Sequence, residues 1–87
     1  MKIKNGFVVR SIAGESVVVA LGEASKTFNG IIKLNETGRF IWDMLSNGAE
    51  ISELTAAILS EYDIDEATAE ADAIAFVDTL KGAGIIE

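Results

Sequence analysis

The sequence predicts one α+β domain with a winged helix-turn-helix-like fold, in which a three-stranded antiparallel sheet precedes three helices (βββααα). Two observations lead to this prediction. The first third of the chain contains short runs of β-branched residues separated by glycines, a pattern typical of strands. From residue 35 onward, apolar residues recur at helical spacing. The 87 residues are enough for a single hydrophobic core, so we expect residues 1–87 to form one domain.

The first two strands are expected over residues 7–12 and 16–21. Both segments are runs of β-branched and aliphatic residues, which favour extended structure. The three residues between them include Gly14 and have the length of a hairpin loop. These two segments therefore predict an antiparallel hairpin.

A third strand is expected at about residues 30–34. It follows Asn29-Gly30, a dipeptide suited to a tight turn or a bulge. A three-stranded sheet has two edges, and the only charge on residues 31–34 is Lys33. This edge is therefore either an ordinary edge protected by its lysine or a template on which a further strand can be added.

The first two helices follow from capping residues and apolar spacing. Asn35 is a good N-cap for a helix over residues 36–46. Ser52 is expected to cap a second helix that ends near Asp63. The residues expected to lie in the core on helical faces are Ile41, Trp42, Leu45, Phe76 and Leu80.

A third helix is expected from Asp65, its N-cap, to about Lys81, and Ile85 and Ile86 are expected to pack back onto the core. This helix is apolar on two faces. One face is expected to meet the core, with Val77 at its margin. The other face is either a shallow apolar groove or a set of exposed helix-forming alanines, and it contains Ala67, Ala71 and Ile74 beside Asp78 and Lys81.

Composition excludes several classes of function. The chain has no Cys and no His, which excludes disulfides, thiolate chemistry and Cys/His zinc sites. The net charge of −7 opposes binding to nucleic acid, because phosphate neutralisation supplies most non-specific affinity. The sequence shows neither an apolar run of about 20 residues nor a signal-peptide pattern, so we expect a cytoplasmic protein that does not bind membranes.

A longer pattern gives a resemblance to a known family. The sequence resembles the PqqD-like family, the stand-alone recognition elements of pathways that make ribosomally synthesised and post-translationally modified peptides (RiPPs). The resemblance covers about residues 5–87. Its most specific part is the block Leu34-Asn35-Glu36-Thr37-Gly38-x-x-Ile41-Trp42, followed by Glu61-Tyr62-Asp63-Ile64-Asp65 and the closing Gly84-Ile85-Ile86.

This resemblance implies that the domain binds the leader segment of a precursor peptide. The leader adds as a strand to the edge of the third strand, against the third helix, and is presented to a separate modifying enzyme of the radical S-adenosylmethionine or lasso-type protease/cyclase class. The acidic residues Asp63, Asp65 and Glu66 have the spacing of a capped turn and do not match an EF-hand loop, so we expect no enzymatic activity, no metal and no cofactor. By position, the peptide-binding residues are Phe28, Asn29, Gly30, Ile31, Ile32, Lys33, Ala71, Ile74, Asp78 and Lys81.

Three alternatives remain at this stage. The protein could be the peptide chaperone of coenzyme PQQ biosynthesis itself. It could be a winged-helix DNA-binding domain, although a recognition helix with Glu66, Glu70, Asp72 and Asp78 would repel phosphates. The open strand edge can also pair with that of a second copy, so the sequence leaves open whether the chain is a monomer or a homodimer through a sheet edge.

Overall fold

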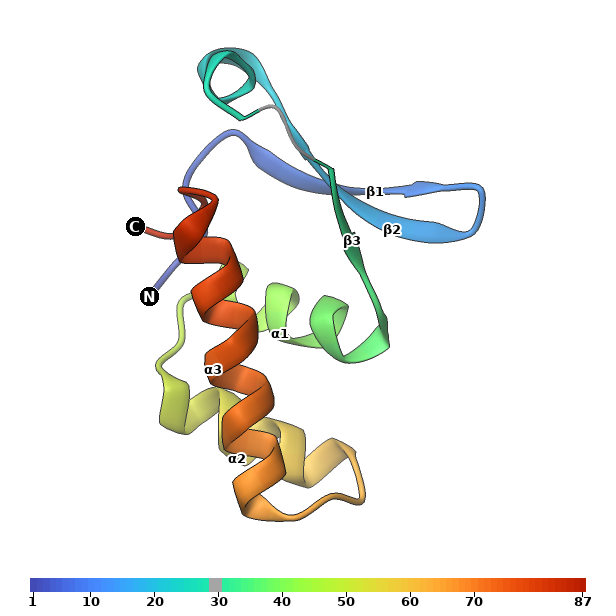
Figure 1. The fold of residues 1–87 in the computed structure, drawn as a ribbon, viewed down its shortest axis with the longest axis vertical. Helices are drawn as coiled ribbons and strands as arrows, with labels where there is room; N and C mark the ends of the chain where they lie inside the picture. Colours follow the sequence, from blue (N-terminus) through green and yellow to red (C-terminus); the bar gives the residue numbers. More distant parts are fainter. Residues whose placement is uncertain (29–30) are drawn as a thin grey trace.

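The computed structural model describes residues 1–28 and 31–87, and it confirms an α+β fold with three strands before three helices. The sheet is antiparallel with the order β1-β2-β3. The hairpin of β1 and β2 extends beyond the helices, and the two chain termini lie side by side (Figure 1). The strands are β1 (Phe7–Ile12), β2 (Glu15–Ala20) and β3 (Ile32–Leu34).

The three predicted helices are present, together with one short helix that the sequence pattern did not indicate. The additional element is the 3-10 helix η1, which connects β2 to the segment before β3. Five residues give too short a run for helical periodicity to be visible in the sequence. The helices are η1 (Gly22–Lys26), α1 (Glu36–Ser46), α2 (Ile51–Glu61) and α3 (Glu66–Gly82).

The hairpin turn is one residue shorter than predicted, because Glu15 belongs to β2. Its two residues, Ala13 and Gly14, have positive φ angles of 52° and 81°. Two-residue turns of this left-handed kind match the right-handed twist of the strands that they join. The turn therefore fixes the register in which Ile12 lies opposite Glu15.

The backbone groups of β1 and β2 alternate between facing the partner strand and facing away. Opposed residues in antiparallel strands are hydrogen bonded at every second position. The Leu21 N–H donates to the Gly6 carbonyl at 2.7 Å, directly beyond the last pair of the register. Counting along the register from this bond, Val8 and Arg10 direct their backbone groups toward β2.

The same alternation determines the free edge of β3. Ser16 and Val18 of β2 direct their N–H and C=O groups away from β1 and toward β3. Their partners in the register are Leu34 and Ile32, whose backbone groups are therefore used within the sheet. Lys33 lies between them, so its N–H and C=O point outward from the sheet edge.

The helix caps agree with the sequence at two of three positions. The Asn35 side chain accepts a hydrogen bond from Gly38 N–H at 2.8 Å, as predicted for α1. The prediction for α2 was wrong, because Glu50 is the N-cap and Ser52 lies in the first turn. The Glu50 N–H donates to the Glu53 carboxylate at 2.9 Å, which is one half of a capping box. Helix α2 begins one residue before Ser52 for this reason.

Asp65 caps α3 as predicted and gives a pH-dependent contribution to stability. Its carboxylate accepts from the Thr68 N–H at 2.7 Å. This backbone hydrogen bond, followed by the bond from the Thr68 side chain, lowers the pKa of Asp65. The folded pKa then lies below the unfolded value of about 3.9, so the stabilisation is complete above that pH and is lost as the pH falls through the folded pKa.

We therefore expect Asp65→Asn to reduce the melting temperature slightly at pH 7, and we expect this difference to shrink as the pH falls below about 3.9. Asparagine retains a capping oxygen but has no charge, which isolates the ionic part of the cap. Thermal unfolding followed by circular dichroism between pH 7 and pH 3 measures the difference. A difference that stays constant over this range would contradict the role of the Asp65 charge.

The core lies between one face of the sheet and the three helices. Ile41, Trp42, Leu45 and Leu80 are buried as predicted, and so are Ile85 and Ile86 at the C-terminal end. Phe76 was predicted in the core but is only half-buried, because α3 is rotated so that Val77 takes the fully buried position. The buried cluster consists of Ile3, Val18, Leu34, Ile41, Trp42, Leu45, Ala49, Leu54, Ile58, Ala69, Ala73, Val77, Leu80, Ile85 and Ile86.

Candidate functional site

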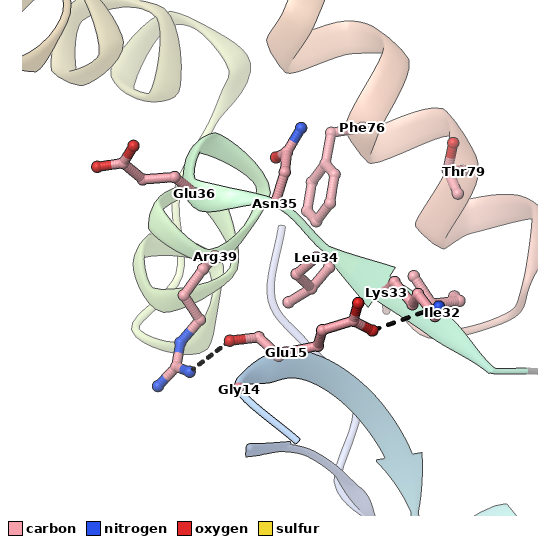
Figure 2. A pocket seen from close by; sticks show the side chains of 11 residues that line it. Gly14, Glu15, Ile32, Lys33, Leu34, Asn35, Glu36, Arg39, Phe76 and Thr79 are labelled. Carbon is pink, nitrogen blue, oxygen red and sulfur yellow. Dashed lines mark hydrogen bonds and ion pairs between the residues drawn. The ribbon is translucent and has the colours of Figure 1, made fainter. Parts of the chain in front are cut away.

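A groove of about 760 Å³ runs along β3, between the start of α1 and the middle of α3. Figure 2 shows Phe76 and Thr79 of α3 on one side, with Leu34 and Ile32 of β3 beside them. The volume lies within the range of 300–1,000 Å³ that is typical of ligand sites. The groove has an apolar floor and is open to solvent along its length, which suits an extended chain better than a compact small molecule.

Charged side chains lie at the end of the groove near the β1–β2 turn. Lys33 Nζ is 3.3 Å from Glu15 Oε2, and Arg39 Nε is 3.1 Å from Asp43 Oδ1. Both pairs are largely exposed, so each contributes little to stability. A ligand can therefore exchange partners with Lys33 or Arg39 at small cost. The rim is charged and balanced, whereas the floor is apolar.

The position of the Phe76 ring depends on the absence of a side chain at residue 38. A Cβ atom on Gly38 would lie 3.1 Å from Phe76 Cε1 and 3.2 Å from Asn35 Oδ1. Gly38 is itself buried in the first turn of α1, against α3. The glycine therefore lets the ring pack against α1 and form the wall of the groove opposite Leu34.

A second cavity, of about 440 Å³, lies on the other face of β3. It is lined by the apolar side chains of Val17, Val19, Phe28 and Ile31, and Lys33 lies at its border. Side chains along a strand alternate between the two faces of a sheet. A strand added to β3 would therefore place successive side chains in the groove and in this second cavity in turn.

The β3 part of the predicted site lies at the groove and along the free edge. Ile32 is half-buried in the groove, Lys33 lies on its rim, and Ile31 is 78% exposed. Phe28 is half-buried and packs edge-on against Phe7, with ring centroids 5.5 Å apart. The predicted residues Asn29 and Gly30 lie outside the described residues.

The α3 part of the predicted site is not brought to the groove. Ala71, Ile74, Asp78 and Lys81 are exposed, and none of them lines the cavity beside β3. A contact between these residues and a peptide stays a prediction. Helix α3 instead turns a neighbouring face toward β3 and toward a smaller cavity of about 280 Å³ at the start of α1; its residues are Asp72, Ala75, Phe76 and Thr79.

Sequence reasoning also missed the contribution of the start of α1. Asn35, Glu36 and Arg39 line the groove, although the sequence suggested only a capping role for Asn35 and none in binding for the others. The direct succession of β3 and α1, with a single residue between them, was the available signal. It places the first turn of α1 at the end of the strand edge.

Comparison with known proteins identifies the family of this chain. The family model described as "Coenzyme PQQ synthesis protein D (PqqD)" matches residues 15–86. The chain belongs to the PqqD family. A comparison with curated proteins gave no match.

Two solved structures resemble this PqqD-family domain over nearly its whole length. One is described as "TbiB1 in Complex with the TbiA(beta) Leader Peptide"; it is 30% identical with a TM-score of 0.79, and the match covers 100% of this chain and 95% of that chain. The other is described as "Lasso peptide synthetase B1 complexed with the leader peptide"; it is 24% identical with a TM-score of 0.75, covering 97% and 93%. At 24% identity, this second structure shows that the fold is shared and nothing more specific.

The described residues of this PqqD-family domain offer no grouping of three or more acidic side chains that could hold a metal ion. Among the same residues, no helix has the length and apolar character needed to cross a membrane.

Proposed function

We propose that this domain binds the leader segment of a ribosomally made precursor peptide along the free edge of β3. The observation that carries the proposal is its similarity, over 100% of the chain, to TbiB1, which was solved with a leader peptide. The outward backbone of Lys33 and the 760 Å³ groove beside it supply a physical site for such a strand.

The proposed mode of binding is strand addition. The leader strand gains backbone hydrogen bonds with β3, each of which contributes about 0.5–1.5 kcal/mol net. Such bonds are independent of sequence, so specificity depends on the side chains that the leader places in the two cavities. Burial of an apolar side chain contributes about 1.5–3 kcal/mol.

We propose that α3 contacts the leader through Phe76 and Thr79. These residues line the groove together with β3, and Figure 2 shows the Phe76 ring next to Leu34. Ala71 and Ile74, which the sequence predicted as contacts, lie on a neighbouring, exposed face of α3. In this proposal they do not touch the leader, so substitutions there serve as controls. Substitutions at the two faces therefore distinguish the two versions of the site.

The proposed role of binding is presentation rather than catalysis. The groove holds the leader, and the remaining part of the precursor stays free for a separate peptide-modifying enzyme, of the radical S-adenosylmethionine or lasso-type class. The carboxylates that line the groove, Glu15 and Glu36, are exposed, and Glu15 forms an ion pair with Lys33. We therefore propose a binding protein rather than an enzyme, and we propose the cytoplasm as its location.

DNA binding is not favoured by the exposed surface of α3. The helix carries Glu66, Glu70, Asp72 and Asp78 on solvent-exposed positions, and Lys81 is its only cation. Four acids on a recognition helix would repel phosphates rather than neutralise them.

An amide chemical-shift titration tests the proposed function. The labelled domain is titrated with the leader half of the precursor peptide encoded beside its gene, and a scrambled peptide of the same composition is the control. We expect shifts at residues 31–34, Phe76 and Thr79, and none at Ala71 or Ile74. Saturating peptide without shifts at β3 would overturn strand addition. Shifts on Ala71 and Ile74 instead would restore the helix face that the sequence predicted.

A further inference from the structure

The second edge of the sheet, formed by β1, is longer and less protected than the edge of β3. Strand β1 has six residues and only one charge, Arg10, whereas β3 has three residues. Long edges with few charges attract other strands, and proteins usually cover them or interrupt them with charges, prolines or bulges. Strand β1 contains none of these devices apart from Arg10.

The backbone groups of β1 that face outward are identified by the register. Because residues 8 and 10 face β2, the groups of Phe7, Val9 and Ser11 point away from the sheet. Within residues 1–28 and 31–87, no hydrogen bond connects these three residues to another element. The edge therefore presents three residues, one at every second position, whose N–H and C=O groups have no partner among the described residues.

We propose that the β1 edges of two copies of this chain pair with each other in an antiparallel manner, centred on Val9. This pairing joins the two sheets into one sheet of six strands and leaves both β3 edges free. It is independent of the proposed leader binding, which uses the opposite edge. A second copy is the proposed occupant because the outward groups of Phe7, Val9 and Ser11 can pair with the same groups of another chain in a two-fold arrangement.

Centring on Val9 matches the outward groups of the two copies. Val9 lies opposite Val9 of the second copy, and Phe7 lies opposite Ser11 in both directions. All three outward residues then form hydrogen-bonded pairs, which gives about six hydrogen bonds in all. A shift of two residues in either direction loses one of these pairs, so the centred register has the most hydrogen bonds.

Charge placement supports the same register. Centring on Val9 places Arg10 opposite Val8 of the second copy, on the sheet face away from the helices. A register centred on Arg10 would place the two arginines directly opposite each other, and like charges in that position are destabilising. Strand pairing alone buries less than the 1,200–2,000 Å² or so of a stable interface, so the dimer is expected to be weak.

The test uses opposite charges at Val8, a half-exposed position on the outer face of β1. In the proposed register, Val8→Glu places a carboxylate opposite Arg10 of the second copy, twice by symmetry. Val8→Lys places a cation there instead. Cross-strand pairs of this kind imply that Val8→Glu tightens the dimer about twofold to thirtyfold, while Val8→Lys weakens it by a similar factor.

Sedimentation equilibrium of the full chain over a wide concentration range measures the dimer dissociation constant. Glu and Lys are both poor strand formers, so each serves as the control for the other. Arg10→Glu combined with Val8→Lys is expected to restore the dimer, and Arg10 is exposed, so the fold tolerates this change. Circular dichroism confirms folding of each variant.

Three results would overturn the proposal. The first is a natural chain that remains monomeric at millimolar concentration. The second is an equal effect of Val8→Glu and Val8→Lys, which excludes this register. The third is dimerisation that leader peptide abolishes, since that result places the contact at β3. Leader binding measured on the same variants is expected to be unchanged, which separates this proposal from the proposed function.

Discussion

Replacement of Lys33 by proline is expected to reduce leader affinity at least about tenfold while the domain remains folded. Proline has no N–H, and its ring occupies space on the side where the N–H was. The Lys33 N–H points outward from β3, so its loss removes a bond to an added strand and leaves the β2–β3 hydrogen bonds in place. One lost bond and the steric obstruction of the edge together give this factor.

Two variants make this result specific. Lys33→Ala removes the charge and keeps the N–H, so it isolates the effect of the Lys33–Glu15 ion pair. Ile32→Pro removes a backbone donor that is used within the sheet and is expected to destabilise the fold. Isothermal titration calorimetry with the leader peptide gives the affinities. Equal affinities for Lys33→Pro and Lys33→Ala would contradict strand addition at β3.

The elements that the sequence predicted well are those with local signals. The hairpin follows from β-branched runs around Gly14, and α1 and α3 begin at the side-chain caps Asn35 and Asp65. The start of α2 was misplaced because glutamate is a less common N-cap than serine, so Ser52 was preferred to Glu50. Glu53, three residues after Glu50, fits a capping box and was the available signal. The sequence thus predicts the start of a helix well when the N-cap is one of the residue types that commonly cap helices.

The rotation of α3 was not predictable from the sequence. A spacing of about 100° per residue separates the face toward the core from the opposite, exposed face, but it does not decide which of the neighbouring residues Phe76 and Val77 takes the fully buried position. The direction of the core is determined by α2 and the sheet, which bury Ala73 and Val77 and leave Phe76 at the groove. The groove lies at β3, where the sequence placed a free edge, whereas the α3 residues that line it, Phe76 and Thr79, are not the ones that the sequence suggested, because their direction depends on packing.

A side chain at residue 38 is expected to affect stability and leader binding together. In Gly38→Val the new Cβ atom would lie 3.1 Å from Phe76 Cε1 and 3.2 Å from the capping oxygen of Asn35, and the two γ-methyl groups need further space. Overpacking of this kind typically costs about 1–3 kcal/mol, and the better helix propensity of valine offsets only a few tenths of that amount. The free energy of unfolding from urea denaturation is expected to fall by about 1–3 kcal/mol.

The same substitution is expected to weaken leader binding, because the ring that it displaces forms the wall of the groove. A double-mutant cycle with Phe76→Ala tests this cause. Removing the ring removes the closest contact of the new side chain, so Gly38→Val is expected to cost less stability, and to change leader affinity less, in the Phe76→Ala background than alone. Additive effects would mean that Gly38 acts through the Asn35 cap instead. A non-additive result would establish that one glycine in α1 determines the shape of the groove through a single aromatic ring of α3.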